Sequence, residues 1–296
     1  MKKFVIDLFY FAGFFAVFFI LINVIYIGII ASTDWDFRKR LESLKLDNPD
    51  FELLVIGASA AMDAVDTELL TSNGIKSYNL GMDGSTIKTS YIQLKEYLSK
   101  YSKKPQYVVL GVNSFHESFN NNGIQPIVDI TMNDHNFSLN DVPILKFKWL
   151  GFEFLKKIIS KKHRKARLIY GQLKFQKTIS DNTNFNGTYL NIQKFESSSW
   201  IGEIAKLCHK NGIELLILEL PGYKEIQNLS EVGPYILCFN NGYSANLYNF
   251  SSKDFCVIFD ADKDWIGNSH LNENGAAKFT RELIRKDVIM LRTNLK

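Results

Sequence analysis

The sequence contains little cysteine and little proline. It has three cysteines and six prolines among 296 residues. Three cysteines do not make a disulfide framework, and no Cys-x-x-Cys pair is present to indicate a zinc ribbon. The six prolines and 18 glycines exclude a collagen-like or proline-rich fibrous chain. Hydrophobic residues make up 46% of the chain and charged residues 22%, which is enough apolar material for a packed core.

A strong excess of charge of one sign is also missing. The net charge is +4, with five basic and three acidic residues in the first 40 positions and 30 basic and 28 acidic residues in the remainder. Proteins bind nucleic acids largely by neutralising phosphates with Lys and Arg. A domain this close to neutral is not expected to have a nucleic-acid partner.

One long uncharged run stands at the start of the chain. Residues 8–31 contain six Ile and six Phe, and as a helix they would span about 36 Å, enough to cross a hydrocarbon core of about 30 Å. A cleaved signal peptide has a shorter apolar region, and no convincing Ala-x-Ala cleavage site follows. A buried core helix usually keeps a polar face, for which only Asn23, Tyr10 and Tyr26 are available. We therefore predict a transmembrane anchor over residues 1–31, with a signal peptide and a core helix as the alternatives.

The charges that flank this run do not decide its orientation. Lys2 and Lys3 favour a cytoplasmic N-terminus, whereas the basic cluster at 38–40 on the other side reduces the asymmetry. Residues 32–50 read as a polar connector, helical from Trp35 to Leu46. The side of the membrane on which the domain lies therefore has to be inferred from the chemistry of that domain.

Short apolar runs alternate with helical stretches in the rest of the chain. The runs typical of buried parallel strands are 52–57, 107–112, 213–220 and 255–259, with a weaker one at 77–80, and the helices are expected at 87–100, 201–210 and 276–285. This alternation predicts a three-layer α/β/α sandwich with a central parallel sheet. The domain is expected to cover residues 51–296, with an insertion or cap at about 119–195 that breaks the rhythm.

Polar and small residues follow several of the predicted strands. Ligands bind outside the carboxyl ends of parallel strands, so these residues are expected at one edge of the sheet. Ser59 would be a nucleophile, and His270, in a loop before the last helix, would be the base that takes its proton. The oxyanion of a tetrahedral intermediate would be bound by the backbone N–H groups of Ser59 and Gly84 and by the amide of Asn113.

Each of these segments also has an ordinary structural interpretation. Ser59 could cap a helix, the segment around Gly84 could be a plain turn, and Asn113 could cap a loop. His270 could be a surface residue at a helix start. Because all four are expected at the same edge of the sheet and together supply the parts of an acyl-transfer site, the joint pattern favours a site.

The four segments together resemble blocks I, II, III and V of the SGNH (GDSL-type) hydrolase superfamily. In this resemblance Gly57-Ala58-Ser59 corresponds to the Gly-Asp-Ser of block I, Gly84 to the block II glycine, Asn113 to the block III asparagine and His270 to the block V histidine. The resemblance implies a flavodoxin-like SGNH fold. It covers residues 51–116 and 255–285, and the middle of the domain only poorly.

Two positions depart from the family pattern. Ala58 replaces the block I aspartate, and Gly267 stands where the family has an aspartate three residues before the histidine. An aspartate at that place would stabilise the imidazolium and fix its tautomer. Asp264 is the candidate third catalytic residue in its stead, and Asp262 or a backbone carbonyl are the alternatives.

The resemblance also implies a function. A membrane-anchored SGNH domain is similar to proteins of polysaccharide O-acetylation, such as the alginate acetylation proteins, and of teichoic-acid D-alanylation. It implies a serine-dependent O-acyltransferase or esterase of a cell-envelope or exported polysaccharide that works through an acyl-Ser59 intermediate, without a metal or an organic cofactor. It further implies a multi-pass membrane acyltransferase as partner, contact with membrane lipid, and a periplasmic or extracellular domain. The alternative is an inactive SGNH-fold protein that binds glycan or acts as a scaffold, and Gly267 is its main support.

Overall fold

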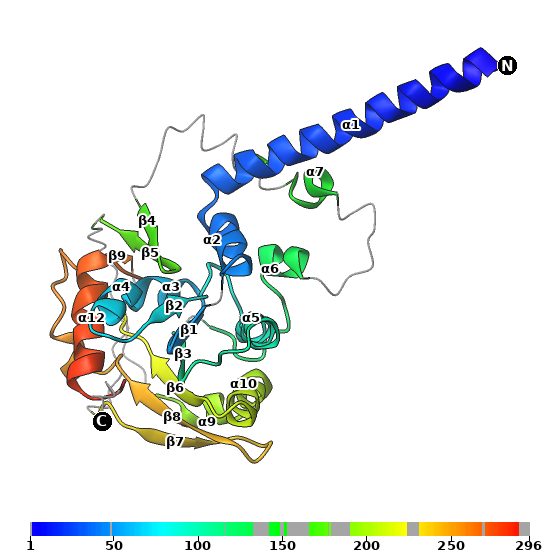
Figure 1. Cartoon of the computed structure of the whole chain (residues 1–296). Helices are drawn as coiled ribbons and strands as arrows, with labels where there is room; N and C mark the ends of the chain where they lie inside the picture. The colour runs from blue at the N-terminus through cyan, green and yellow to red at the C-terminus, as the bar shows by residue number, and fades with distance from the viewer. Residues whose placement is uncertain are drawn as a thin grey trace.

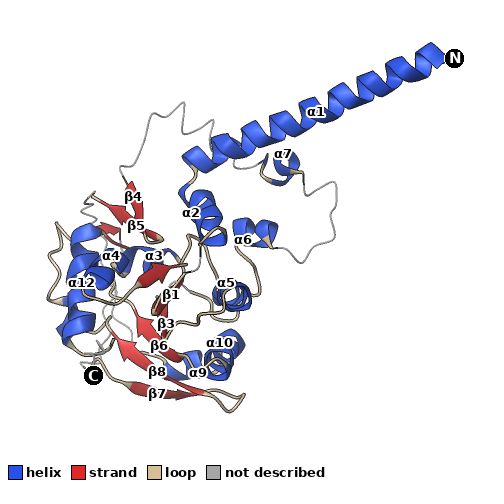
Figure 2. Ribbon diagram, viewed as in Figure 1, coloured by secondary structure: helices blue, strands red, loops and turns tan. Residues whose placement is uncertain are grey.

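The computed structural model describes most of the chain. The described residues are 2–47, 49–115, 117–132, 142–148, 151–152, 166–176, 178, 190–223, 231–267 and 270–289. The structural statements below concern these residues. Figures 1 and 2 show a long N-terminal helix that projects from a domain built around one sheet.

The central sheet has six strands in the order β2-β1-β3-β6-β8-β7. Five of them run parallel, and β7 pairs antiparallel with β8 at the edge. The strands in this spatial order are β2 (Ser77–Asn79), β1 (Leu53–Gly57), β3 (Tyr107–Val112), β6 (Glu214–Glu219), β8 (Ser244–Asn249) and β7 (Tyr235–Cys238). Because β1 lies between β2 and β3, the chain changes direction across the sheet there, which is where open α/β sheets bind ligands.

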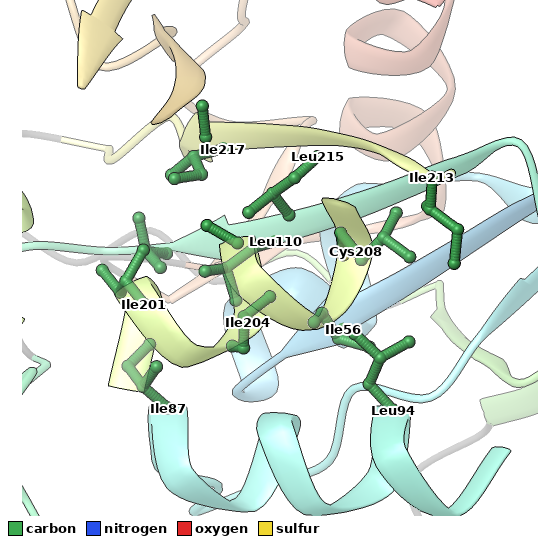
Figure 3. Close-up of a cluster of buried hydrophobic side chains, with 14 of the residues drawn as sticks. Ile56, Ile87, Leu94, Leu110, Ile201, Ile204, Cys208, Ile213, Leu215 and Ile217 are labelled. Atoms are coloured by element: carbon green, nitrogen blue, oxygen red, sulfur yellow. The ribbon is translucent and has the colours of Figure 1, made fainter. Parts of the chain in front are cut away.

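Helices cover both faces of the sheet because alternate side chains of each strand point to opposite faces. Leu54 and Ile56 of β1 pack in one cluster with α5 (Ile87–Lys100) and α10 (Ser199–Lys210). Figure 3 shows part of this cluster, with Ile204 and Leu94 reaching toward the strands. Leu53 and Val55 point the other way and pack with α3 (Ser59–Ala64), α4 (Thr67–Ser72) and α12 (Glu273–Arg285). The predicted three-layer α/β/α arrangement is therefore confirmed.

Most predicted elements occur within two or three residues of their expected bounds, and one is wrong. Residues 253–256 form a short helix, α11 (Lys253–Cys256), in place of the predicted strand at 255–259. A buried strand would cover every side chain, but Val257 is 75% exposed. The strand beside β6 is instead β8, whose sequence Ser-Ala-Asn-Leu-Tyr-Asn alternates between buried and more exposed positions.

The N-terminal run forms one helix, α1 (Lys2–Thr33). Within the described residues it is the one helix long and apolar enough to cross a membrane, with a mean hydropathy of 2.7 in its most apolar window. Its large apolar side chains are exposed from Phe4 to Val24 with few exceptions. An apolar surface of this kind is unfavourable in water and is typical of a helix that crosses a membrane.

The connector helix α2 (Trp35–Leu44) packs into the domain, although its sequence is polar. Lys39 and Arg40 are both only 2% exposed. Arg40 forms an ion pair of 2.6 Å with Glu96 of α5 and donates to Thr131 Oγ1 at 2.8 Å. These contacts hold α2, which directly follows α1, against the domain.

The predicted insertion at 119–195 is described in part, because residues 133–141, 153–165 and 179–189 lie outside the described ranges. Its described elements are α6 (Pro126–Thr131), α7 (Pro143–Lys146), β4 (Ala166–Ile169), β5 (Gln172–Phe175) and α9 (Ile192–Glu196). The β4–β5 hairpin packs against α3, and the carbonyl of Tyr170 in its turn accepts from the N–H of Asn79 at 2.9 Å. The hairpin therefore borders the same sheet edge as the residues that follow β1 and β2.

Candidate functional site

A cavity of about 270 Å³ lies at the carboxyl ends of β1, β2 and β3. Ser59, Gly84 and Asn113, which sequence reasoning selected from three separate segments, all line it. The structure thus brings three of the predicted site residues to one place. The rest of the lining is small or polar apart from Ile87, and consists of Ala58, Ala60, Asp83, Ser85, Thr86, Glu117, Ser118 and Asn121.

Ser59 is the first residue of α3, directly after β1. The N-cap residue Ala58 makes no side-chain hydrogen bond to the first turn. N–H groups in the first turn of a helix have no partner within the helix, so an alanine cap leaves them without a side-chain acceptor. The alternative interpretation, in which a serine caps this helix, does not apply, because the cap position is Ala58.

Two glycines explain how α3 comes so close to the sheet. Gly57 and Gly111 face each other across the β1–β3 pair. A Cβ on Gly57 would lie 2.3 Å from the carbonyl oxygen of Gly111, and one on Gly111 would lie 2.8 Å from the Cβ of Ala61. Only glycine at both positions allows this packing. It places Ser59 at the edge of the sheet beside the residues that follow β3.

Gly84 has a positive φ of +66°, which L-residues with a side chain adopt at a cost. A Cβ at this position would meet no heavy atom within 4 Å. The backbone conformation therefore requires glycine, and a side chain would have room only toward open space.

Asn113 is 2% exposed and held by several hydrogen bonds. Its backbone N–H donates to Glu117 Oε1 at 3.0 Å, and its side-chain oxygen accepts from the N–H of Phe115 at 3.1 Å. This bond fixes the orientation of the side-chain amide, whose Nδ2 atom is its hydrogen-bond donor.

His270 begins strand β10 (His270–Leu271), which pairs with β9 (Trp265–Gly267) in an antiparallel hairpin. Its Nδ1 lies 2.8 Å from Asp63 Oδ2. Asp63 belongs to α3, four residues after Ser59, and residues four apart share one face of a helix. The imidazole is therefore joined to the same short helix that begins with Ser59, although His270 does not itself line the cavity.

Asp63 is 3% exposed, and its environment sets its charge. Burial raises the pKa of Asp63 to about 6, while the hydrogen bond from His270 and the charges of His270 and Lys39 act in the opposite direction. At neutral pH the group is a carboxylate. An Asp in this relation to a histidine fixes the tautomer with a proton on Nδ1 and stabilises the imidazolium.

The prediction of Asp264 as the partner of His270 has to be corrected. The Asp264 carboxylate accepts from Lys278 at 2.5 Å and from the N–H of Asp260 at 2.6 Å, and is 1% exposed. The alternative candidate, Asp262, is exposed on a turn. The carboxylate at His270 Nδ1 comes from Asp63 instead.

Gly267 lies opposite His270 in the register of the hairpin. A Cβ at this position would be 3.9 Å from the imidazole Cδ2. The position where the family pattern has an aspartate is thus next to the ring, but the carboxylate reaches the ring from α3.

Sequence reasoning also missed Lys39. Its ammonium donates a hydrogen bond to the carbonyl of Gly81, in the loop that leads from β2 to Gly84. Burial lowers the pKa of Lys39 to about 7, and the carboxylates of Asp36 and Asp63 oppose this shift. The Asp36 carboxylate accepts from the N–H of Asp83 at 3.2 Å, so α2 contacts this loop at two points.

Two further carboxyl groups lie beside Asn113, of which Glu219 is buried and Glu117 is partly buried. Burial raises the pKa of Glu117 to about 7 and that of Glu219 to about 8. Glu219 accepts from the hydroxyl of Ser114 at 2.7 Å, and Glu117 lines the cavity. No group of three or more His, Cys, Asp or Glu in the described ranges is arranged to hold a metal ion.

No family model and no curated protein sequence matches this chain. Among solved structures it is similar to a GDSL-like lipase from Bacteroides thetaiotaomicron, with 13% identity and a TM-score of 0.27 over 66% of this chain and 61% of the lipase. It is also similar to a protein from Bacteroides fragilis named as an acylhydrolase, with 13% identity and a TM-score of 0.36 over 86% of this chain and 97% of that one. This chain thus spans about three fifths of the length of the lipase.

Proposed function

We propose that this protein is a serine-dependent esterase or O-acyltransferase with Ser59 as nucleophile, His270 as base and Asp63 as the residue that orients the base. The Asp63–His270 pair at 2.8 Å, with Asp63 one helical turn from Ser59, is the observation that carries this proposal. The alternative of an inactive scaffold depended on the missing carboxylate at position 267. Asp63 supplies a carboxylate from another element, which favours the enzyme.

In the first half of the reaction, Ser59 Oγ attacks the acyl carbonyl and His270 Nε2 accepts the hydroxyl proton. The N–H groups of Ser59 and Gly84 and the amide of Asn113 bind the oxyanion that forms. When the intermediate collapses, the bond to the leaving alcohol breaks and His270 returns the proton to that oxygen. An acyl-Ser59 ester remains.

In the second half, a hydroxyl group attacks this ester while His270 takes its proton. The tetrahedral intermediate then releases Ser59, which regains a proton from His270. A sugar hydroxyl as acceptor makes the protein a transferase, and water makes it an esterase. We favour transfer, because an anchor would hold the domain close to a membrane-borne acyl donor.

The cavity suggests the kind of acyl group. With about 270 Å³ and a mainly small and polar lining, it suits a short acyl group such as acetyl better than a long chain. Among the described residues its lining contains two carboxyl side chains and no Lys or Arg, which disfavours an anionic substrate at this place. A neutral envelope or exported polysaccharide with O-acyl groups fits this chemistry.

The helix α1 suggests where the reaction takes place. An anchored domain that acts on an exported polysaccharide would face the periplasm or the exterior, with Lys2 and Lys3 on the cytoplasmic side. A multi-pass membrane acyltransferase would supply the acyl group. Cys238 is an exposed free cysteine far from α1 in the sequence. A membrane-impermeant maleimide should label it in intact cells, and Cys238→Ser should remove that signal.

A fluorophosphonate probe tests the nucleophile. The full-length protein should become labelled, and Ser59→Ala should abolish the label. Ser118→Ala is the matched control, because Ser118 also lines the cavity but is exposed, and it should keep the label. Absence of labelling in the wild-type protein, under conditions that label a known serine esterase, would support the scaffold. Mass spectrometry of the envelope glycan from cells with and without the protein then tests the proposed substrate. An unchanged acylation pattern would exclude this glycan as the substrate.

A further inference from the structure

A second, apolar cavity of about 370 Å³ lies between the C-terminal part of α1 and the segment around α7. It is lined by Tyr26, Ile29, Ile30, Ile144, Lys148, Gly151 and Phe152. The serine and histidine of the candidate active site do not take part in it. Its position along α1 and the hydrogen bonds of α7 indicate the kind of ligand that this cavity binds.

If α1 spans a membrane, the length of the helix places this cavity at the membrane surface. From Lys3 to Tyr26 a helix rises about 35 Å at about 1.5 Å per residue, slightly more than a hydrocarbon core of about 30 Å. If Lys3 lies at one surface, Tyr26 reaches the other, where tyrosine is commonly found. The polar residues Asp34 and Asp36 follow and lie beyond that surface.

Side chains of α1 satisfy both ends of α7. The side-chain oxygen of Asn23 accepts from the N–H of Ile144 at 3.0 Å, and the hydroxyl of Tyr26 donates to the carbonyl of Phe147 at 2.8 Å. The first position of α7 is Pro143, which has no N–H to satisfy. Backbone groups at helix ends need partners from side chains or water, and the hydrocarbon side of a membrane surface offers no water. The two hydrogen bonds thus hold α7 against α1 without relying on water.

The outer side of this segment is apolar. Leu145 is 52% exposed and Phe152 66% exposed, and Phe152 also lines the cavity. Lys148 stands at the same cavity and is exposed. Long basic side chains at a membrane surface keep their stems in the apolar layer and their ammonium groups at the phosphates.

We propose that residues 142–148 and 151–152 lie in the membrane surface beside α1, and that the apolar cavity binds an acyl chain of a phospholipid whose phosphate contacts Lys148. This inference rests on α1 spanning the membrane and is independent of the acyl-transfer chemistry. The lipid fixes the depth of α1 and the height of the domain above the bilayer.

Photolabelling tests the proposal without any change to the protein. The full-length chain is reconstituted in vesicles that contain a phospholipid with a diazirine on its acyl chain, illuminated, digested and mapped by mass spectrometry. Adducts are expected at Leu145 or Phe152 and at Tyr26–Ile30, in addition to the exposed part of α1. Ile236 and Val257 are the controls, because they are 69% and 75% exposed but lie in other parts of the domain, and they should carry no adduct.

Variants then separate the cavity from general membrane contact. Phe152→Asp should reduce the adducts at Tyr26–Ile30 several-fold, and Ile236→Asp should leave them unchanged. Lys148→Glu should also reduce the adducts at Tyr26–Ile30, and the reduction should be largest in vesicles rich in anionic lipid. Adducts confined to Phe4–Ile22 in the wild-type protein would overturn the proposal. So would protection of Leu145 and Phe152 by a co-purified membrane protein in place of lipid.

Discussion

Asp63 Oδ2 lies 2.8 Å from His270 Nδ1, and Asp63 stands four residues after Ser59 on the same helix. The proposed nucleophile and the proposed orienting carboxylate are thus carried by one short element, and only the proposed base comes from elsewhere in the chain. The proposed activity therefore depends on the packing of α3 for two of its three groups.

The first prediction concerns Asp63→Asn. The change keeps the shape of the side chain but lets the imidazole adopt the wrong tautomer, so kcat for a short-chain ester should fall by about 10³–10⁴-fold. The amount of Ser59 that the fluorophosphonate probe labels should decrease in parallel. Asp264→Asn is the comparison, since Asp264 is bonded to Lys278 and not to the imidazole. If Asp264→Asn removed activity and Asp63→Asn did not, the assignment of Asp63 would be wrong.

The second prediction concerns pH and Lys39. Because the pKa of Asp63 is about 6, protonation of this carboxylate should lower activity as the pH falls through 6. Lys39 lowers the pKa of Asp63 through its charge. Lys39→Met should therefore raise that pKa and move the acid limb of kcat/KM to higher pH, by up to about one unit. Lys45→Met, an exposed change at the end of α2, should leave the pH profile in place.

The third prediction separates backbone strain from loss of the oxyanion donor. Gly84 and Gly74 both have a positive φ, +66° and +90°, and a Cβ at either position would meet nothing within 4 Å. Changing either to alanine should therefore cost about 1–2 kcal/mol of stability. Only Gly84→Ala should also reduce kcat, by about tenfold or more, because it disturbs an oxyanion donor. Thermal unfolding and ester hydrolysis of both variants provide the measurement.

The fourth prediction concerns the buried carboxyl groups beside Asn113. Burial raises the folded-state pKa of Glu219 from 4.5 to about 8, so the folded protein binds this proton more tightly than the unfolded chain. Stability from this group is therefore fully present below about pH 4.5 and is lost as the pH rises toward 8. Glu219→Gln should make the fall in Tm between pH 5 and pH 8 smaller by a few degrees.

Glu214→Gln is the control for that measurement. Glu214 begins the same strand, β6, but is exposed, so its change should leave the pH dependence of Tm as in the wild-type protein. An equal effect of both changes would show that Glu219 does not carry the dependence.

The sheet could be predicted well because buried strands leave a strong signal. Apart from Glu52, the runs at 52–57 and 107–112 are apolar, and both form central strands with covered faces. The strand β8 was not predicted because half of its positions are polar, as its place next to the edge strand allows. The apolar run at 255–259 has a similar composition to a strand, but only the tertiary structure shows that Val257 points to solvent.

The carboxylate proposed to orient His270, that of Asp63, was missed for a different reason. The spacing of Ser59 and Asp63 indicates that both share a helix face, but this signal has meaning only once His270 is known to lie against that face. Lys39 gave no signal at all, because a basic residue in a polar helix normally lies in water. Its partner Gly81 is 42 positions away.

The burial of Lys39 has a practical consequence for anyone preparing the domain in soluble form. A truncation at Asp50, where the sequence places the domain boundary, would delete the ammonium group beside Asp63 and the support of the Gly81 carbonyl. It would also expose Glu96 and the apolar surface that Phe37 covers. A recombinant fragment should therefore begin no later than Asp34, the residue that caps α2.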